Sequence, residues 1–361
     1  MNTPIAENKP LYASIQFLRF FAAMLVVVMH ATEAISLRIP QYMHSGYWGL
    51  GSSGVDIFFV ISGFVMAITT SNKPGLLRER LTQASLFIRR RIVRIVPLYW
   101  FYTLLKMAFV VLIPSLTLRT TLELPHIIYS FLFIPSKSPW GLVQPILPVG
   151  WTLFFEMLFY WVFALAIVLA VQRFIWCLLV FILINWVSVD YPDSIVMMFY
   201  SQSIVFEFVL GSLVAEIISR YQSLPLWLGF LSVLVGWILI FGISWPKGVD
   251  RCLTWGVGAA FLVLGCLICE KHQLLQTMFI KLKIFGDISY STYLCHTFVV
   301  PALVVVFNKF QFSNAYLITT VCCGLVICCS FISYFYIEKP LTQLAGYILI
   351  NVQLLPLQVK P

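Results

Sequence analysis

Charged side chains are scarce in this sequence. Asp, Glu, Lys and Arg make up 10% of its 361 residues, whereas a soluble domain carries about 25%. Hydrophobic residues reach 61%, above the roughly 45–50% of soluble proteins. This composition excludes an ordinary soluble domain. It also leaves no basic soluble region to explain the net charge of +9, so we do not expect nucleic acid as a partner.

Disulfide and metal-binding patterns are missing as well. The nine cysteines lie in or beside apolar stretches, which is typical of residues that pack in a core. No CxxC pair has a matching second pair, so the sequence predicts no zinc site. We therefore expect no metal cofactor.

The apolar residues that are present form blocks of about twenty, the length that crosses a hydrocarbon core. They predict an all-α polytopic membrane protein with about ten transmembrane helices, although nine or eleven crossings remain open. The first block is too long for a cleaved signal peptide, and Glu7 and Lys9 precede it. The predicted spans are 14–35, 50–70, 92–113, 148–171, 174–189, 196–218, 224–243, 252–270, 284–306 and 314–337.

The connections between these blocks predict an orientation. Most Lys and Arg fall on the inner side if the N-terminus is cytoplasmic, so we expect both termini in the cytoplasm. The chain then divides into a cytoplasmic segment 1–13, a membrane domain 14–341 and a cytoplasmic tail 342–361. Residues 71–91 are expected to form a basic inner loop. Residues 114–147 are expected to form a long outer segment, which could be a lid or a re-entrant piece.

Several ionisable residues fall inside the predicted spans, where a charge costs about 2.5–3.5 kcal/mol. Arg19 and His30 are eleven residues apart, which places both on one helix face, about 16 Å apart along the axis. Asp56 lies in the outer third of its span and Glu156 in the outer half of its own. Such residues face the protein interior and are candidates for function. A structural ion pair for Asp56 and a neutralised Glu156 are the alternatives.

Other polar residues in the spans allow two readings each. Arg91 and Arg94 lie one turn apart and make a fork suited to phosphate, although they could simply anchor the helix at the inner interface. Ser62 lies at mid-membrane, where it could serve a site or permit close helix packing with its glycine neighbour. Tyr293 and His296 share a helix face, and His296 is either a catalytic group or a packed, hydrogen-bonded one.

Six sequence elements, in their order along residues 14–341, resemble the acyltransferase-3 family of bacterial membrane acyltransferases. They are LRFFAAMLVVVMH, GVDIFFVISGF, FIRRRIVRIVPLY, GWTLFFEMLFY, ISYSTYLCH and EKPL. The resemblance implies transfer of an acyl group, usually acetyl, from cytoplasmic acyl-CoA to a carbohydrate or lipid-linked glycan. It implies a protein of the bacterial inner membrane that modifies lipopolysaccharide O-antigen or exopolysaccharide at the periplasmic face. It also implies that Arg19, His30, Arg91 and Arg94 form the functional core.

The expected donor is acetyl-CoA, bound as a substrate. Coenzyme A is anionic and cannot cross a bilayer, so its phosphates should stay at the inner face near Arg91 and Arg94. Arg19 would contact the pantetheine arm or a phosphate. The thioester would be presented near His30, while the glycan acceptor enters from outside.

His30 is the expected general base, because imidazole titrates near neutral pH. Asp56 or Glu156 would orient the ring and stabilise its charge, as the third member of a catalytic triad does. Three residues could donate to the oxyanion of the tetrahedral intermediate, namely Arg19, Tyr293 and Ser62. Direct transfer and an acetyl-histidine intermediate both remain open.

Two other classes of function fit the same buried charges. A secondary transporter would use them as a proton relay or substrate site, although the sequence shows no inverted repeat. A non-catalytic glycan-binding component would bind acyl-CoA without turning it over. Consumption of acetyl-CoA by the purified protein separates the three.

Overall fold

The computed structural model describes residues 12–42, 48–70, 75–113, 122–221, 223–246 and 248–350. Within these ranges the chain is helical, and its β-structure is limited to one isolated bridge between Lys137 and Val143. The all-helical fold class predicted from the sequence is thereby confirmed for the described residues. Seven helices of the described residues are long and apolar enough to cross a membrane: Ala13–Arg38, Gly49–Thr69, Leu77–Leu112, Pro148–Leu169, Cys252–Glu270, Ser289–Lys309 and Ala315–Ile350.

The remaining predicted spans correspond to shorter helices. These are α6 (Arg173–Ser188), α8 (Phe206–Arg220) and α9 (Leu226–Trp237), which a π-helical turn extends to Gly242. The predicted span 196–218 is not one helix, because α7 (Ile195–Tyr200) ends before the polar run Ser-Gln-Ser and α8 begins after it. The total of ten crossings therefore stays a prediction.

Helix α3 (Leu77–Leu112) begins fifteen residues before the predicted span. The prediction of an inner loop at residues 71–91 is wrong for residues 77–91, which are helical. These residues are rich in strong helix formers and contain no Gly or Pro. Glu79 accepts a hydrogen bond from the backbone N–H of Leu76 and caps the helix start. Residues 71–74 lie outside the described part of the chain.

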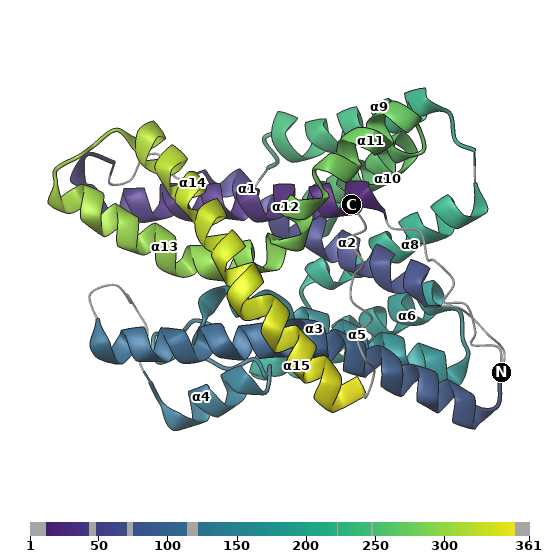
Figure 1. The fold of residues 1–361 in the computed structure, drawn as a ribbon. Coiled ribbons are helices and arrows are strands. Elements are labelled where there is room, and N and C mark those ends of the chain that lie inside the picture. The colour runs from purple at the N-terminus through teal and green to yellow at the C-terminus, as the bar shows by residue number, and fades with distance from the viewer. Residues whose placement is uncertain are drawn as a thin grey trace.

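The last helices also run further than predicted. Helix α14 (Ala315–Ser333) continues through a π-helical turn into α15 (Lys339–Ile350), which passes the expected domain boundary at residue 341. Helix α15 crosses α3 obliquely (Figure 1). Before α13 (Ser289–Lys309), the short helix α11 (Gln273–Lys281) lies in the predicted connection 271–283. A second short helix, α12 (Lys283–Asp287), takes up the start of the predicted span 284–306, so that span is not one helix.

The core crossing joins α2 (Ser53–Thr69) to α8 at two glycines. A Cβ atom on Gly63 would collide with the carbonyl oxygen of Phe208, and one on Gly211 with that of Val60. The two backbones therefore touch directly, as small residues allow in membrane helices. The close approach predicted from Ser62-Gly63 is confirmed for the glycine. This contact fixes the position of α2, which carries much of the site described below.

Helix α1 (Ala13–Arg38) is held at its start by an acid from a distant helix. The buried Glu270, at the end of α10 (Val257–Glu270), accepts hydrogen bonds from the backbone N–H of Ala13 (2.6 Å) and from the hydroxyl of Ser14 (2.5 Å). A carboxylate at a helix N-terminus accepts hydrogen bonds from free N–H groups and interacts favourably with the helix dipole.

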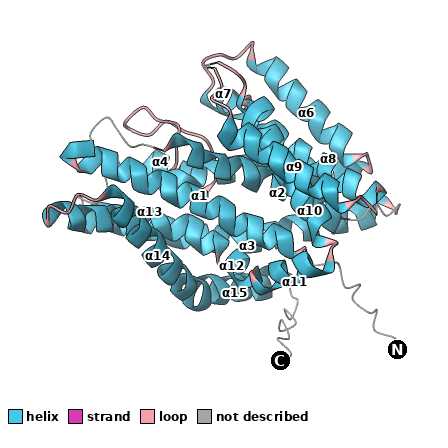
Figure 2. Cartoon of the chain, turned by 90° about the horizontal axis from the view of Figure 1, so that it is seen from above, coloured by secondary structure: helices cyan, strands magenta, loops and turns pink. Residues whose placement is uncertain are grey.

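In the view of Figure 2, α1 and α3 lie between α6 at one edge and α15 at the other.

The segment 122–147 packs onto α3 and contains α4 (Leu124–Phe131). Tyr99 donates to the carbonyl of Ser130, and the Ser130 hydroxyl accepts from the backbone N–H of Ile146. His126 is buried with Nδ1 3.0 Å from the Ser136 hydroxyl, and burial lowers the pKa of this histidine. The lid or re-entrant role stays a prediction, and residues 114–121 lie outside the described part.

Candidate active site

A cavity of about 700 Å³ lies between α1, α2, α3, α5 (Trp151–Leu169) and α13. It follows α2 from Val55 to Thr70, roughly 22 Å of helix at 1.5 Å per residue. Its two ends differ in chemistry. We call them the basic end, which contains Arg19, Gln83, Arg90, Arg91 and Arg94, and the aromatic end, which contains Phe58, Thr152 and Tyr293.

The basic end gathers arginines from two helices. Arg90, Arg91 and Arg94 come from α3, and Arg19 comes from α1. The Arg91 side chain donates to the Thr69 hydroxyl (3.3 Å). Arg19 donates to the side-chain oxygen of Gln16 (3.1 Å). Within the described part of the chain, no acid lies within 4 Å of these arginines to form a salt bridge. Guanidinium groups that form no salt bridge remain available to bind phosphates.

A carboxylate lies midway along the cavity. Glu156 accepts a hydrogen bond from the Ser62 hydroxyl (3.0 Å) and a short one from the Tyr160 phenol. Ser62 and Glu156 are unrelated candidates in the sequence analysis. In the structure, Ser62 on α2 and Glu156 on α5 contact each other. Tyr160 was missed, although its position four residues after Glu156 could have indicated it. The Ser62 hydroxyl donates its hydrogen bond to this carboxylate.

Tyr293 closes the aromatic end. Its phenol donates to the carbonyl of Val149 (2.9 Å) and lies 3.0 Å from the Thr152 hydroxyl. Its ring meets Phe58 edge-on, with centroids 5.7 Å apart. These contacts lock the ring between the start of α5 and α2, so the cavity ends at this wall.

The two candidate histidines lie beyond the wall. The centroid of the His296 ring is 6.0 Å from that of Tyr293, and His30 stacks on His296 at 5.2 Å. His296 is fully buried and its Nδ1 lies 3.2 Å from the Thr292 carbonyl. The His30 side chain is 32% exposed. His30 is not among the residues that line the cavity. The expectation that the thioester is presented near His30 stays a prediction.

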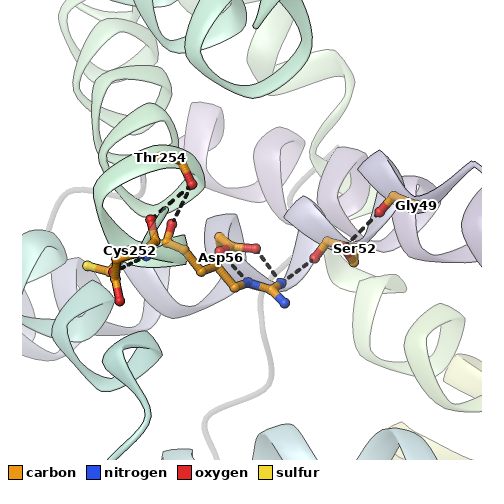
Figure 3. Close-up of polar contacts among 7 residues, drawn as sticks. Gly49, Ser52, Asp56, Cys252 and Thr254 are labelled. Atoms are coloured by element: carbon orange, nitrogen blue, oxygen red, sulfur yellow. Dashed lines mark hydrogen bonds and ion pairs between the residues drawn. The ribbon is translucent and has the colours of Figure 1, made fainter. Parts of the chain in front are cut away.

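Neither Asp56 nor Glu156, the two acids expected to orient His30, forms a hydrogen bond with it. Asp56 is fully buried and accepts two hydrogen bonds from Arg251, which also donates to the Ser52 carbonyl (Figure 3). The Arg251 guanidinium lies 5.0 Å from the Trp255 ring centroid. Asp56 faces this side because its helix phase turns it away from α13. The acid that contacts His30 is Glu33, whose Oε2 lies 3.0 Å from the imidazole Nδ1.

Sequence reasoning missed both Glu33 and Arg251, for different reasons. Glu33 follows His30 by three residues on one helix, so helical spacing alone could have identified it. Arg251 is 195 positions from Asp56, and nothing local connects them. In the described residues, no group of three or more His, Cys, Asp or Glu side chains is placed to hold a metal ion.

Comparison with known proteins assigns the chain to a family. A family model described as an acyltransferase domain matches residues 12–335. The chain belongs to the acyltransferase-3 family. It is also 36% identical over 268 residues to the exopolysaccharide production protein ExoZ of Rhizobium meliloti (strain 1021), across 71% of this chain and 79% of that protein. No solved structure matches the chain.

Family membership confirms the resemblance drawn from the six sequence elements. The protein is a membrane acyltransferase. The matched region includes the arginines of the basic end, Glu156 and both candidate histidines. Membership therefore favours an enzyme over a transporter for this set of buried charges.

Proposed function

We propose that the protein transfers an acyl group, in the simplest case acetyl, from cytoplasmic acyl-CoA to a sugar hydroxyl. The acceptor is a surface glycan, exopolysaccharide or lipopolysaccharide O-antigen, at the periplasmic face of a bacterial inner membrane. The observation that carries the proposal is the cavity, which is basic at one end and stops one aromatic ring short of two histidines at the other. The name of the relative ExoZ favours exopolysaccharide.

The basic end fits the charged half of the donor. Arg91 and Arg94 would hold the phosphates of coenzyme A, because guanidinium binds phosphate through paired hydrogen bonds. The neutral pantetheine arm would follow α2 toward Tyr293. Arg19 lies about 16 Å below His30 along α1, which is too far for an oxyanion formed at His30. We therefore assign Arg19 to the donor's phosphates or arm.

His30 would act as the general base. Its free nitrogen takes the proton of the acceptor hydroxyl while the oxygen attacks the thioester carbonyl. The carbon–sulfur bond then breaks, and the protonated imidazole gives its proton to the thiolate of coenzyme A as it leaves, which returns His30 to its neutral form. The products are an O-acyl sugar and free coenzyme A. For the thioester to reach His30, the side chains of Phe58 and Tyr293, which form the wall, have to rotate out of its path.

The same proposal fixes an orientation. The basic end would face the cytoplasm, with ten crossings and both termini on that side. Two observations support it. The Arg89 side chain donates to the carbonyl of Leu349 at the end of α15, and Arg19, near the start of α1, belongs to the basic end. Both helix ends therefore lie on the side of the cavity that would bind acyl-CoA.

Acyl transfer can be tested with two measurements. Mass spectrometry of surface glycans from cells with and without the gene should show the loss of one acyl group per modified sugar. Purified protein in lipid should release free coenzyme A from radiolabelled acetyl-CoA only when the glycan is present. Unchanged glycans together with no release of coenzyme A would contradict the proposal, and binding of acetyl-CoA without turnover would point to a glycan-binding component.

A further inference from the structure

The contact between His30 and Glu33 is the starting point. Both residues lie on α1, three positions apart, with Nδ1 3.0 Å from Oε2. The Glu33 side chain is 44% exposed. An exposed ion pair of this spacing often contributes little to stability, so its importance depends on what it does to the imidazole.

The contact selects one tautomer of His30. An ionised carboxylate can only accept hydrogen bonds, so the imidazole must donate from Nδ1. The proton of the neutral ring then sits on Nδ1, and Nε2 keeps its lone pair. A general base needs such a lone pair to receive the acceptor proton. Without Glu33, the proton could occupy either nitrogen, and part of the enzyme would present an N–H to the acceptor.

His296 makes this selection more important. Its ring covers one face of His30, and its own Nδ1 donates to the Thr292 carbonyl if the ring is neutral. A fully buried imidazole offers no negative charge to a protonated neighbour. Asp56, on α2, is already paired with Arg251. Among the contacts of the described residues, Glu33 is thus the anion placed to stabilise His30 after it takes a proton.

We propose that Glu33 is the positioning residue of His30, fixing its tautomer and balancing the charge that forms on the ring during acyl transfer. This inference rests on the proposed function, in which His30 is the base. Glu33 itself need not touch either substrate. It acts through His30, in the role that the sequence had assigned to Asp56 or Glu156.

The test compares variants of Glu33 in purified protein reconstituted in lipid. Glu33→Gln keeps the size of the side chain but removes its charge, and its amide can donate as well as accept. We expect kcat for acyl transfer to fall about tenfold, less than for loss of the base because water can partly replace a half-exposed acid. The KM for acetyl-CoA should not change, since the basic end is remote. Glu33→Asp should recover part of kcat.

Glu216→Gln is the matched control. Glu216 also pairs with a cation on its own helix, Arg220, but neither residue lines the cavity. It should leave kcat unchanged. A Glu33→Gln variant with normal kcat, or one in which Asp gives no recovery, would overturn the inference. His30→Ala is measured alongside. If it stays active, the proposed function has the wrong base. If it is inactive while Glu33→Gln is normal, only the inference about Glu33 fails.

Discussion

The guanidinium of Arg251 donates two hydrogen bonds to the carboxylate of Asp56, with Nη2 2.7 Å from Oδ2 and Nε 2.9 Å from Oδ1. Asp56 is fully buried in this pair, whereas the Arg251 side chain is one-third exposed. The pair ties the start of α2 to the π-helical turn Cys252–Gly256 that precedes α10. This is the structural ion pair that the sequence allowed as one interpretation of Asp56, and a catalytic role for Asp56 stays a prediction.

Removing Arg251 should therefore destabilise the protein. Arg251→Ala leaves a buried carboxylate without its partner, which costs about 3 kcal/mol when the lost partner was itself partly exposed. Thermal unfolding in detergent should show a clear loss of stability. Arg220→Ala, which breaks an exposed pair with Glu216, is the control and should unfold near the wild-type temperature. Equal unfolding temperatures for the two variants would contradict the structural role.

Helical spacing explains why much of the site could be read from the sequence. Arg91 and Arg94 share a face of α3, and Ser62 and Glu156 occupy the interior faces of their helices. Polar residues in apolar helices must face the protein, so they meet wherever those helices pack. The structure accordingly places them in one cavity.

The failures involve information that the local sequence does not contain. Depth along a helix suggested that Asp56 and His30 would meet, but the rotation of α2 about its axis turns Asp56 toward Arg251 instead. Likewise, hydropathy detects where a helix enters lipid but not where it starts, so α3 begins well before its apolar part. The wall formed by Phe58 and Tyr293 depends on packing between three helices.

Donor binding should depend on Arg91 and Arg94. Each replacement by Ala removes a charge-assisted hydrogen bond worth about 1.5–3 kcal/mol, so we expect acetyl-CoA to bind about tenfold or more weakly. Lys should rescue only in part, because it cannot form the paired contact. Isothermal calorimetry in detergent measures this directly. Arg220→Ala should bind normally, and unchanged affinity in both Arg91→Ala and Arg94→Ala would remove them from the donor site.

His30 should be needed for transfer but not for donor binding. His30→Ala should insert and fold, bind acetyl-CoA normally and lose acyl transfer by about 10²-fold or more. The binding should persist because His30 lies outside the cavity. His272→Ala, at an exposed histidine before α11, is the control. Near-normal acylation of glycan by His30→Ala at equal protein levels would show that another group is the base.

The arrangement of the cavity predicts that the two substrates come from opposite sides of the membrane. Arg91 and Arg94 lie at one end, while His30 lies beyond the other end and is partly exposed. Arg19, near the start of α1, lines the same end, and the end of α15 contacts Arg89, which directly precedes Arg90 of that end. A C-terminal tag should therefore mark the side from which acyl-CoA enters.

Sealed proteoliposomes with the C-terminal tag on a known side test this arrangement most directly. Radiolabelled acetyl-CoA is supplied on one side and the glycan on the other, and label in the glycan is measured. We predict transfer only when acetyl-CoA is on the side of the tag and the glycan is on the opposite side. Equal transfer with acetyl-CoA supplied on the side away from the tag would contradict the arrangement in which the substrates enter from opposite sides, and donor and acceptor would then have to enter from one side.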